Sequence, residues 1–62
     1  MNNQYRHTYC FYMNTGEHIM MDANFMDVMD DYILLYREEE EPYESPIMMI
    51  YVKDLMAWEM IR

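Results

Sequence analysis

A chain of 62 residues with a single cysteine has to fold without an internal disulfide bond. So small a chain buries only about 60% of the surface that its unfolded form exposes, and its stability is marginal unless something supplements the core. Cys10 and the two histidines do not form the pattern of a structural zinc site. Since 53% of the residues are apolar, with ten Met and seven Tyr, we expect a homodimer or an apolar binding face.

The formal charge of −8 is confined to one segment of the chain. Residues 22–44 contain nine acidic residues and one basic residue, Arg37, which is a net charge of −8. In the two flanking segments, three acidic residues balance three basic residues. The sequence therefore predicts an acidic surface presented by a small, strongly apolar scaffold.

The sequence also indicates where the protein resides. Its N-terminus lacks the apolar core of a signal peptide, and no apolar run approaches the roughly 18 residues that a membrane helix needs. Together with the unpaired cysteine, this predicts a soluble cytoplasmic protein without a membrane partner. Only four basic residues are present, so we do not expect direct binding to nucleic acid.

Two strands joined by a tight turn are predicted for residues 5–22. Aromatic and β-branched side chains dominate as far as Met13, which favours a strand. The only glycine, Gly16, ends the turn at a position that needs a positive φ. If it is the bulge residue of a three-residue loop, Met13 faces Glu17. The predicted core face then carries Tyr9, Phe11, Met13, Ile19 and Met21, and the other face carries Arg6, Thr8, Cys10, Tyr12, His18 and Met20.

A short helix is predicted after this hairpin, capped by Asp22 or Asn24. Apolar residues recur at i, i+3, i+4 and i+7, a spacing typical of a helix with one face on a core. Those residues are Phe25, Val28, Met29 and Tyr32. The helix would present Asp27, Asp30 and Asp31 on its opposite, exposed side.

The second half of the chain is predicted as an antiparallel pair of strands, 32–38 and 47–52. They are joined by an acidic loop, residues 38–46, because four adjacent glutamates and two prolines disfavour a paired strand there. After a kink at 53–54, a last element follows. Alternation at Met56, Trp58 and Met60 favours a strand, and the spacing of Leu55, Trp58 and Ile61 fits a helix.

These elements predict a single domain, residues 1–62, of the α+β class. It would contain a small antiparallel sheet of four to five strands with one short helix. The expected order is β-β-α-β-β-β, with the last element a strand or a helix.

The acidic residues have the spacing of a phosphate track. Carboxylates two residues apart on an extended chain lie about 6.6 Å apart, and those three or four apart on a helix lie about 5–6 Å apart. A helix and a loop that carry them side by side could occupy the basic groove of a nucleic-acid enzyme. The alternative is that the charge only keeps an apolar protein in solution. The acidic residues predicted to bind a partner are Asp27, Asp30, Asp31, Glu38, Glu39, Glu40, Glu41 and Glu44.

Aromatic and methionine side chains are the candidates for apolar anchors in a binding surface. Tyr43 is the most distinctive of them, because it lies between acidic residues and prolines in the predicted loop. We also expect Phe25 and Tyr36 to contact a partner. Further candidates are Tyr12, Met20 and Trp58. The alternative for each is a place in the core or in a dimer interface.

No arrangement of residues points to catalysis or to a cofactor. His7 and His18 point to opposite sides of the predicted hairpin, and Cys10 within a strand is more often a small hydrophobic residue than a ligand or a nucleophile. A segment that begins like a calcium loop at Asp22 has Asp27 where a glycine is required. Paired carboxylates on an exposed surface lack the desolvated cleft that acid–base catalysis requires. We therefore predict a non-enzyme with no metal and no cofactor.

The order of these features resembles that of the uracil-DNA glycosylase inhibitors of small Bacillus phages. The resemblance covers residues 8–35 and 47–61: an apolar strand, a turn with Gly16, a second apolar strand, and a short helix that opens with Asn24-Phe25. It implies a dimeric DNA mimic of three strands and one helix, in which Phe25 enters a hydrophobic pocket of the target. The acidic loop is an insertion relative to that family. Anti-CRISPR proteins are similar in being small and often acidic.

The favoured hypothesis is a non-catalytic inhibitor of phage type. It would be a homodimer in the bacterial host cytoplasm and would present its acidic segment to a host nucleic-acid-processing or defence protein. One alternative is a sponge that holds a nucleotide signal at a dimer interface. Since anionic nucleotides need Arg or Lys, changes at Arg6 and Arg37 would impair a sponge and spare a mimic. A second alternative is a structural or adaptor protein.

Overall fold

The computed structural model describes residues 5–43 and 45–62 of the chain. These residues form six β-strands and one turn of 3-10 helix. In chain order the elements are β1 (His7–Met13), β2 (His18–Ala23), β3 (Phe25–Val28), β4 (Tyr32–Tyr36), β5 (Met48–Tyr51), η1 (Val52–Asp54) and β6 (Leu55–Met60).

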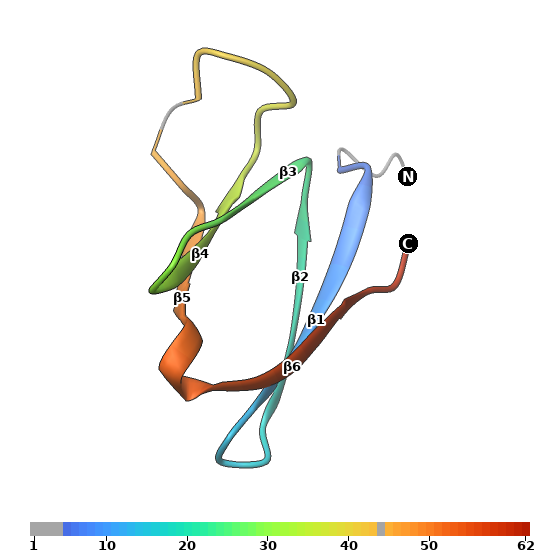
Figure 1. Cartoon of the computed structure of the whole chain (residues 1–62). Helices are drawn as coiled ribbons and strands as arrows, with labels where there is room; N and C mark the ends of the chain where they lie inside the picture. The colour runs from blue at the N-terminus through green and yellow to red at the C-terminus, as the bar shows by residue number, and fades with distance from the viewer. Residues whose placement is uncertain (1–4, 44) are drawn as a thin grey trace.

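The strands form two antiparallel sheets of three strands each (Figure 1). In the first sheet β1 lies between β2 and β6, and in the second β4 lies between β3 and β5. Only Asn24 separates β2 from β3, so one bent segment of chain belongs to both sheets. A strand that changes sheets at a bend is one way in which packed sheets form a corner.

Asn24 holds this corner through its main chain and its side chain. Its N–H donates to the carbonyl of Tyr36 at 3.0 Å, and its side-chain oxygen accepts from the N–H of Arg6 at 2.6 Å. Its side-chain amide also donates to the carbonyl of Arg37. The residue predicted to cap a helix therefore joins the two sheets.

The prediction of an α+β fold with a helix after Asp22 is wrong. The described part of the chain has no α-helix, and Phe25–Val28 form strand β3. This strand pairs with β4 from Phe25 opposite Tyr36 to Val28 opposite Ile33. Pairing satisfies the main chain of these residues in a ladder, whereas a helix of two turns is marginal without extensive packing. The helix that the phage-inhibitor resemblance implies at Phe25 is absent for the same reason.

The hairpin prediction is confirmed in its register. Met13 N–H donates to the Glu17 carbonyl at 2.8 Å, and Gly16 N–H donates to the Met13 carbonyl at 2.9 Å. Gly16 has a φ of +97°, which side chains disfavour. The strands then pair from Tyr12 opposite His18 onwards, so the local turn chemistry determines which residues share a face.

A small core lies between the sheets. Its buried members are Tyr9, Phe11, Ala23, Ile33, Leu35 and Ile50. The predicted core face of the hairpin is confirmed, because Met13, Ile19 and Met21 pack against these residues. Cys10 is also buried, although it lies on the opposite face of β1.

The predicted strand pair in the second half is confirmed as β4 and β5, which are antiparallel. The kink corresponds to η1, and the last element is a strand, β6. β6 returns to pair with β1, from Tyr9 opposite Met60 to Met13 opposite Leu55, with an irregularity next to Tyr12. No helix within the described residues is long and apolar enough to cross a membrane.

Candidate functional site

The acidic segment is divided between the two ends of the second sheet. The acidic loop connects β4 to β5, whereas Asp30 and Asp31 lie in the turn between β3 and β4. The five residues of β4 separate these ends by about 15 Å, and Figure 1 places the loop and the turn apart. The expected continuous track, in which Asp27, Asp30 and Asp31 lie beside the loop, is therefore not formed. We call these three residues the acidic turn.

The acidic loop is exposed and is tied to the first sheet by an ion pair. Arg6 Nη1 lies 2.9 Å from Glu39 Oε1, and the two side chains are 63% and 52% exposed. Glu40 and Glu41 are exposed, and Glu38 is half-buried. An exposed pair of this kind contributes between zero and about 1 kcal/mol, so it orients the loop more than it stabilises the fold. Glu44, also predicted to bind a partner, lies outside the described residues.

Three aromatic side chains attach the acidic loop to the second sheet. Tyr43 stacks on Phe25 with ring centroids 4.7 Å apart and an interplanar angle of 10°, and its ring lies 5.1 Å from that of Tyr36. Phe25 and Tyr36 are cross-strand partners with centroids 6.0 Å apart. All three are half-buried. This aromatic cluster unites the three residues predicted as partner-binding anchors and gives Tyr43 a structural role in positioning the loop.

Replacing Tyr43 with alanine should release the acidic loop without unfolding the sheets. Aromatic pairs contribute about 0.5–1.5 kcal/mol beyond area burial, so losing these ring contacts should raise loop opening about tenfold. Digestion with a glutamate-specific protease, read by mass spectrometry, measures cleavage within residues 38–41. Tyr43→Phe keeps the ring and should be cleaved as slowly as the unaltered protein. Equal cleavage of the two variants would contradict an anchoring role.

The acidic turn is held by main-chain hydrogen bonds and lies beside a cation. Met29 N–H donates to the Tyr32 carbonyl at 2.9 Å, and Val52 N–H donates to the Asp31 carbonyl at the same distance. The second bond connects η1 to the turn, where Asp30, Asp31 and Lys53 share a small pocket. Asp30 and Asp31 are exposed and Asp27 is half-buried. Lys53 therefore offsets part of the negative charge of the acidic turn, as Arg6 does for the acidic loop.

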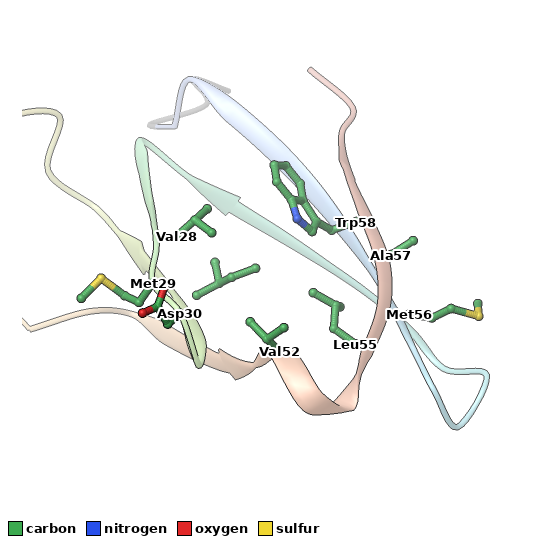
Figure 2. Close-up of a pocket in the computed structure, with 9 residues that line it drawn as sticks. Val28, Met29, Asp30, Val52, Leu55, Met56, Ala57 and Trp58 are labelled. Carbon is green, nitrogen blue, oxygen red and sulfur yellow. The ribbon is translucent and has the colours of Figure 1, made fainter.

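An apolar groove lies between the acidic turn and β6 (Figure 2). Its volume is about 470 Å³. Val28, Val52, Leu55 and Trp58 are directed toward a shared space, with Asp30 at the edge. The residues that line it are Val28, Met29, Asp30, Ile33, Val52, Leu55, Met56, Ala57 and Trp58. Because none of these is a cation, the groove suits an apolar group rather than an anionic ligand.

Tyr12 and Glu59 form a polar contact on the outer face of the first sheet. The Tyr12 hydroxyl donates to the Glu59 carboxylate, and its ring meets that of His18 edge-on at 4.7 Å. The hydrogen bond to Glu59, reinforced by Cys10, raises the pKa of Tyr12 well above its usual value. On the other face, burial raises the pKa of Tyr9. Neither phenol is an activated nucleophile, since a raised pKa holds the proton in place.

Tyr12 should therefore ionise later than an exposed tyrosine when the protein is titrated with alkali. Its folded-state pKa is above the ordinary value of 10.0, so the stability it contributes is complete below about pH 10 and is lost as the pH rises through the folded-state pKa. In an absorbance titration, Glu59→Ala should lower the pH at which Tyr12 ionises. Tyr12→Phe should remove one group that ionises at high pH. Unchanged titration curves for both variants would contradict the assignment.

The remaining candidate ligands are dispersed. The His7 ring contacts Tyr9, whereas His18 contacts Tyr12 on the opposite face of the hairpin, as the sequence predicts. His7 Nδ1 lies 3.0 Å from the Arg62 carbonyl. Among the described residues, no group of three or more His, Cys, Asp or Glu side chains is placed to hold a metal ion.

Sequence reasoning did not predict the groove. The helical spacing predicts a buried face for Val28 and Met29, whereas both are exposed, Val28 at the end of β3 and Met29 just beyond it. The alternation of Met56, Trp58 and Met60 predicts a strand with an apolar side. The irregularity next to Tyr12 changes this pattern, so that Leu55 and Trp58 are directed into the groove and the Met56 side chain is directed away from its centre (Figure 2). That β6 lies next to the β3–β4 turn follows only from its pairing with β1.

Comparisons with protein-family models, with curated proteins and with solved structures find no match for this chain. The interpretation of its surface therefore depends on the geometry of the acidic loop, the aromatic cluster and the apolar groove.

Proposed function

We propose that the protein is a non-catalytic inhibitor of phage type that binds a host nucleic-acid-processing or defence protein through its acidic loop. The observation that carries the proposal is the attachment of a run of four glutamates to a rigid sheet by the aromatic cluster. A solubilising charge run has no need of such an anchor. A binding surface benefits from one, since ordering it in advance lowers the entropy cost of association.

The electrostatics support a basic partner. A net charge of −8 attracts a positively charged groove over a range set by the Debye length, about 8 Å at physiological ionic strength. Association should therefore be fast at low salt and weaken steeply as salt is added. The acidic turn, about 15 Å from the loop, would reach a second basic region of the same groove.

We expect the protein to act as a homodimer, since exposed apolar side chains remain after folding. A target inside the host would place it in the bacterial cytoplasm. The nucleotide-sponge alternative has less support. Arg6 is engaged by Glu39, and the lining of the apolar groove has no cation to neutralise a phosphate.

The test is a pull-down from bacterial lysate at low salt, with stepwise elution by salt and mass spectrometry of bound proteins and small molecules. A nuclease, glycosylase, polymerase or defence protein released at moderate salt is the expected result. A nucleotide that co-purifies without a protein partner would overturn the inhibitor proposal in favour of a protein that sequesters a nucleotide signal. An empty column would leave only a structural or solubilising role and would overturn the proposal.

A further inference from the structure

Most of the large apolar side chains that are exposed among the described residues lie around the apolar groove and along β6. Val28, Met29, Val52, Met56 and Trp58 line the groove, and Met60 and Ile61 lie at the end of β6. Met49 and Tyr51 alternate with the buried Ile50 and lie on the outer face of the second sheet, and Met20 lies on β2. The seven residues of the groove and β6 expose an area on the order of 700 Å², close to what one partner contributes to a standard protein interface.

β6 is the centre of this region and is the edge of its sheet. It pairs with β1 on one side, and the strand order places no strand of the described residues on its other side. Main-chain groups alternate along an antiparallel ladder. Because Ile61 N–H donates to Thr8 on β1 at 2.7 Å, the main-chain groups of Met60 and Trp58 face the free edge. A long apolar edge of this kind is a template for another strand.

We propose that a second copy of this chain covers the region, with β6 pairing antiparallel to β6 of that copy about a two-fold axis at Trp58. The first sheet of one copy and the first sheet of the other would then form one continuous sheet of six strands. In this register Trp58 faces Trp58 of the other copy, Ala57 faces Glu59, and Met56 faces Met60. These pairs join residues 56–60 of the two strands, and a two-fold contact of this type closes into a dimer without further growth.

Charge selects this register over the one centred on Glu59. Moving the second strand by two residues would centre the pairing on Glu59 and place the two carboxylates directly opposite each other, which is unfavourable. In the proposed register Glu59 faces a small neutral residue, and its carboxylate is engaged by Tyr12. The acidic loops remain away from β6 (Figure 1).

The first test uses proline to block the free edge. Met60 and Met20 are 54% and 60% exposed on the two edge strands of the same sheet. The N–H of each faces outward, because Met13 N–H bonds to Glu17 and Ile61 N–H bonds to Thr8. Proline at either position therefore removes no bond within the sheet. By light scattering, the unaltered protein and Met20→Pro should have twice the chain mass, and Met60→Pro should have the chain mass.

The second test determines the register and does not depend on proline. Ala57→Cys and Glu59→Cys are made separately in a Cys10→Ala background, which removes the only natural cysteine. Opposed residues in a non-hydrogen-bonded pair have Cα atoms about 4.5 Å apart, within reach of a disulfide. Mild oxidation of the mixture should cross-link the two variants. Each variant alone should stay largely uncross-linked, since its cysteines would be about 8 Å apart, beyond the limit.

These experiments test the dimer independently of the proposed inhibitor function. The inference deepens the homodimer expected under the proposed function and does not depend on the target. A chain that is monomeric at all concentrations, a Met60→Pro variant that remains dimeric with a native circular dichroism spectrum, or cross-linking of either cysteine variant alone would overturn it. A confirmed dimer that binds no basic protein would support the inference about the dimer and contradict the proposed inhibitor function.

Discussion

Replacing Phe11 with alanine is expected to unfold the protein under native conditions. The side chain is 0% exposed and lies against the ring of Tyr9, with ring centroids 6.3 Å apart. Truncating a buried phenylalanine costs about 3–5 kcal/mol. A core of this size supplies no more than about 3–5 kcal/mol of net stability. The loss therefore equals the whole stability of the chain.

Urea unfolding followed by circular dichroism measures this effect. Met20→Ala is the control, since its side chain is exposed on the neighbouring strand and its effect should stay within about 0.5 kcal/mol. Raising the protein concentration should restore part of the stability of Phe11→Ala if folding is coupled to dimer formation. A cooperative transition within about 1 kcal/mol of the unaltered protein would contradict the central position of Phe11 in the core.

Changing Glu38, Glu39, Glu40 and Glu41 together to lysine is expected to abolish binding to the basic partner. Four reversals change the net charge from −8 to 0 and turn an attractive loop into a repulsive one. Electrostatic attraction accounts for about 10–1000-fold in association rate, so affinity at low salt should fall by at least about 100-fold. Binding of the partner isolated by pull-down, measured over a range of salt concentrations, is the readout.

Two further variants show whether the loop or the overall charge is responsible. Changing the same four residues to glutamine gives a net charge of −4, and so does changing Asp30 and Asp31 to lysine. If the loop makes the contact, the glutamine variant should bind much more weakly than the variant of the acidic turn. Equal binding by the two would indicate a general effect of net charge. Retained affinity after the fourfold reversal, with an unchanged circular dichroism spectrum, would contradict the proposed function.

The structure gives the predicted anchor residues a different role, because their rings contact one another. The sequence predicts a helix at Phe25, a strand at Tyr36 and a loop at Tyr43, each for an independent reason. Strand β3 places Phe25 opposite Tyr36, and Tyr43 then stacks on Phe25 and contacts Tyr36. No short-range pattern predicts this, because Tyr43 is 18 residues from Phe25 and the contact depends on β4 lying between them in the chain. The anchors therefore position the loop, and Glu39, Glu40 and Glu41 are exposed on it.

The prediction of a short helix capped by Asp22 or Asn24 is wrong, because the same side chains fit both the helical and the extended period. Phe25, Val28 and Met29 have helical spacing, and Phe25–Val28 can equally line up beside the β-branched and aromatic residues of β4. In a chain with so little core, the ladder that β3 forms with β4 contributes more than an isolated helix of two turns. The choice depends on a tertiary partner and not on local propensity.

Local chemistry was sufficient for the features that depend on neighbouring residues. Gly16 determines the turn, the turn determines the register of β1 and β2, and the register determines which hairpin residues enter the core. The confinement of charge to residues 22–44 is likewise a property of the sequence. Only the tertiary structure decided that this segment folds as strands, with its acidic residues at opposite ends of a sheet and an apolar groove beside one of them. Strand pairing between residues far apart in the chain determines those distances, and such pairing depends on the total burial and hydrogen bonding of the whole fold.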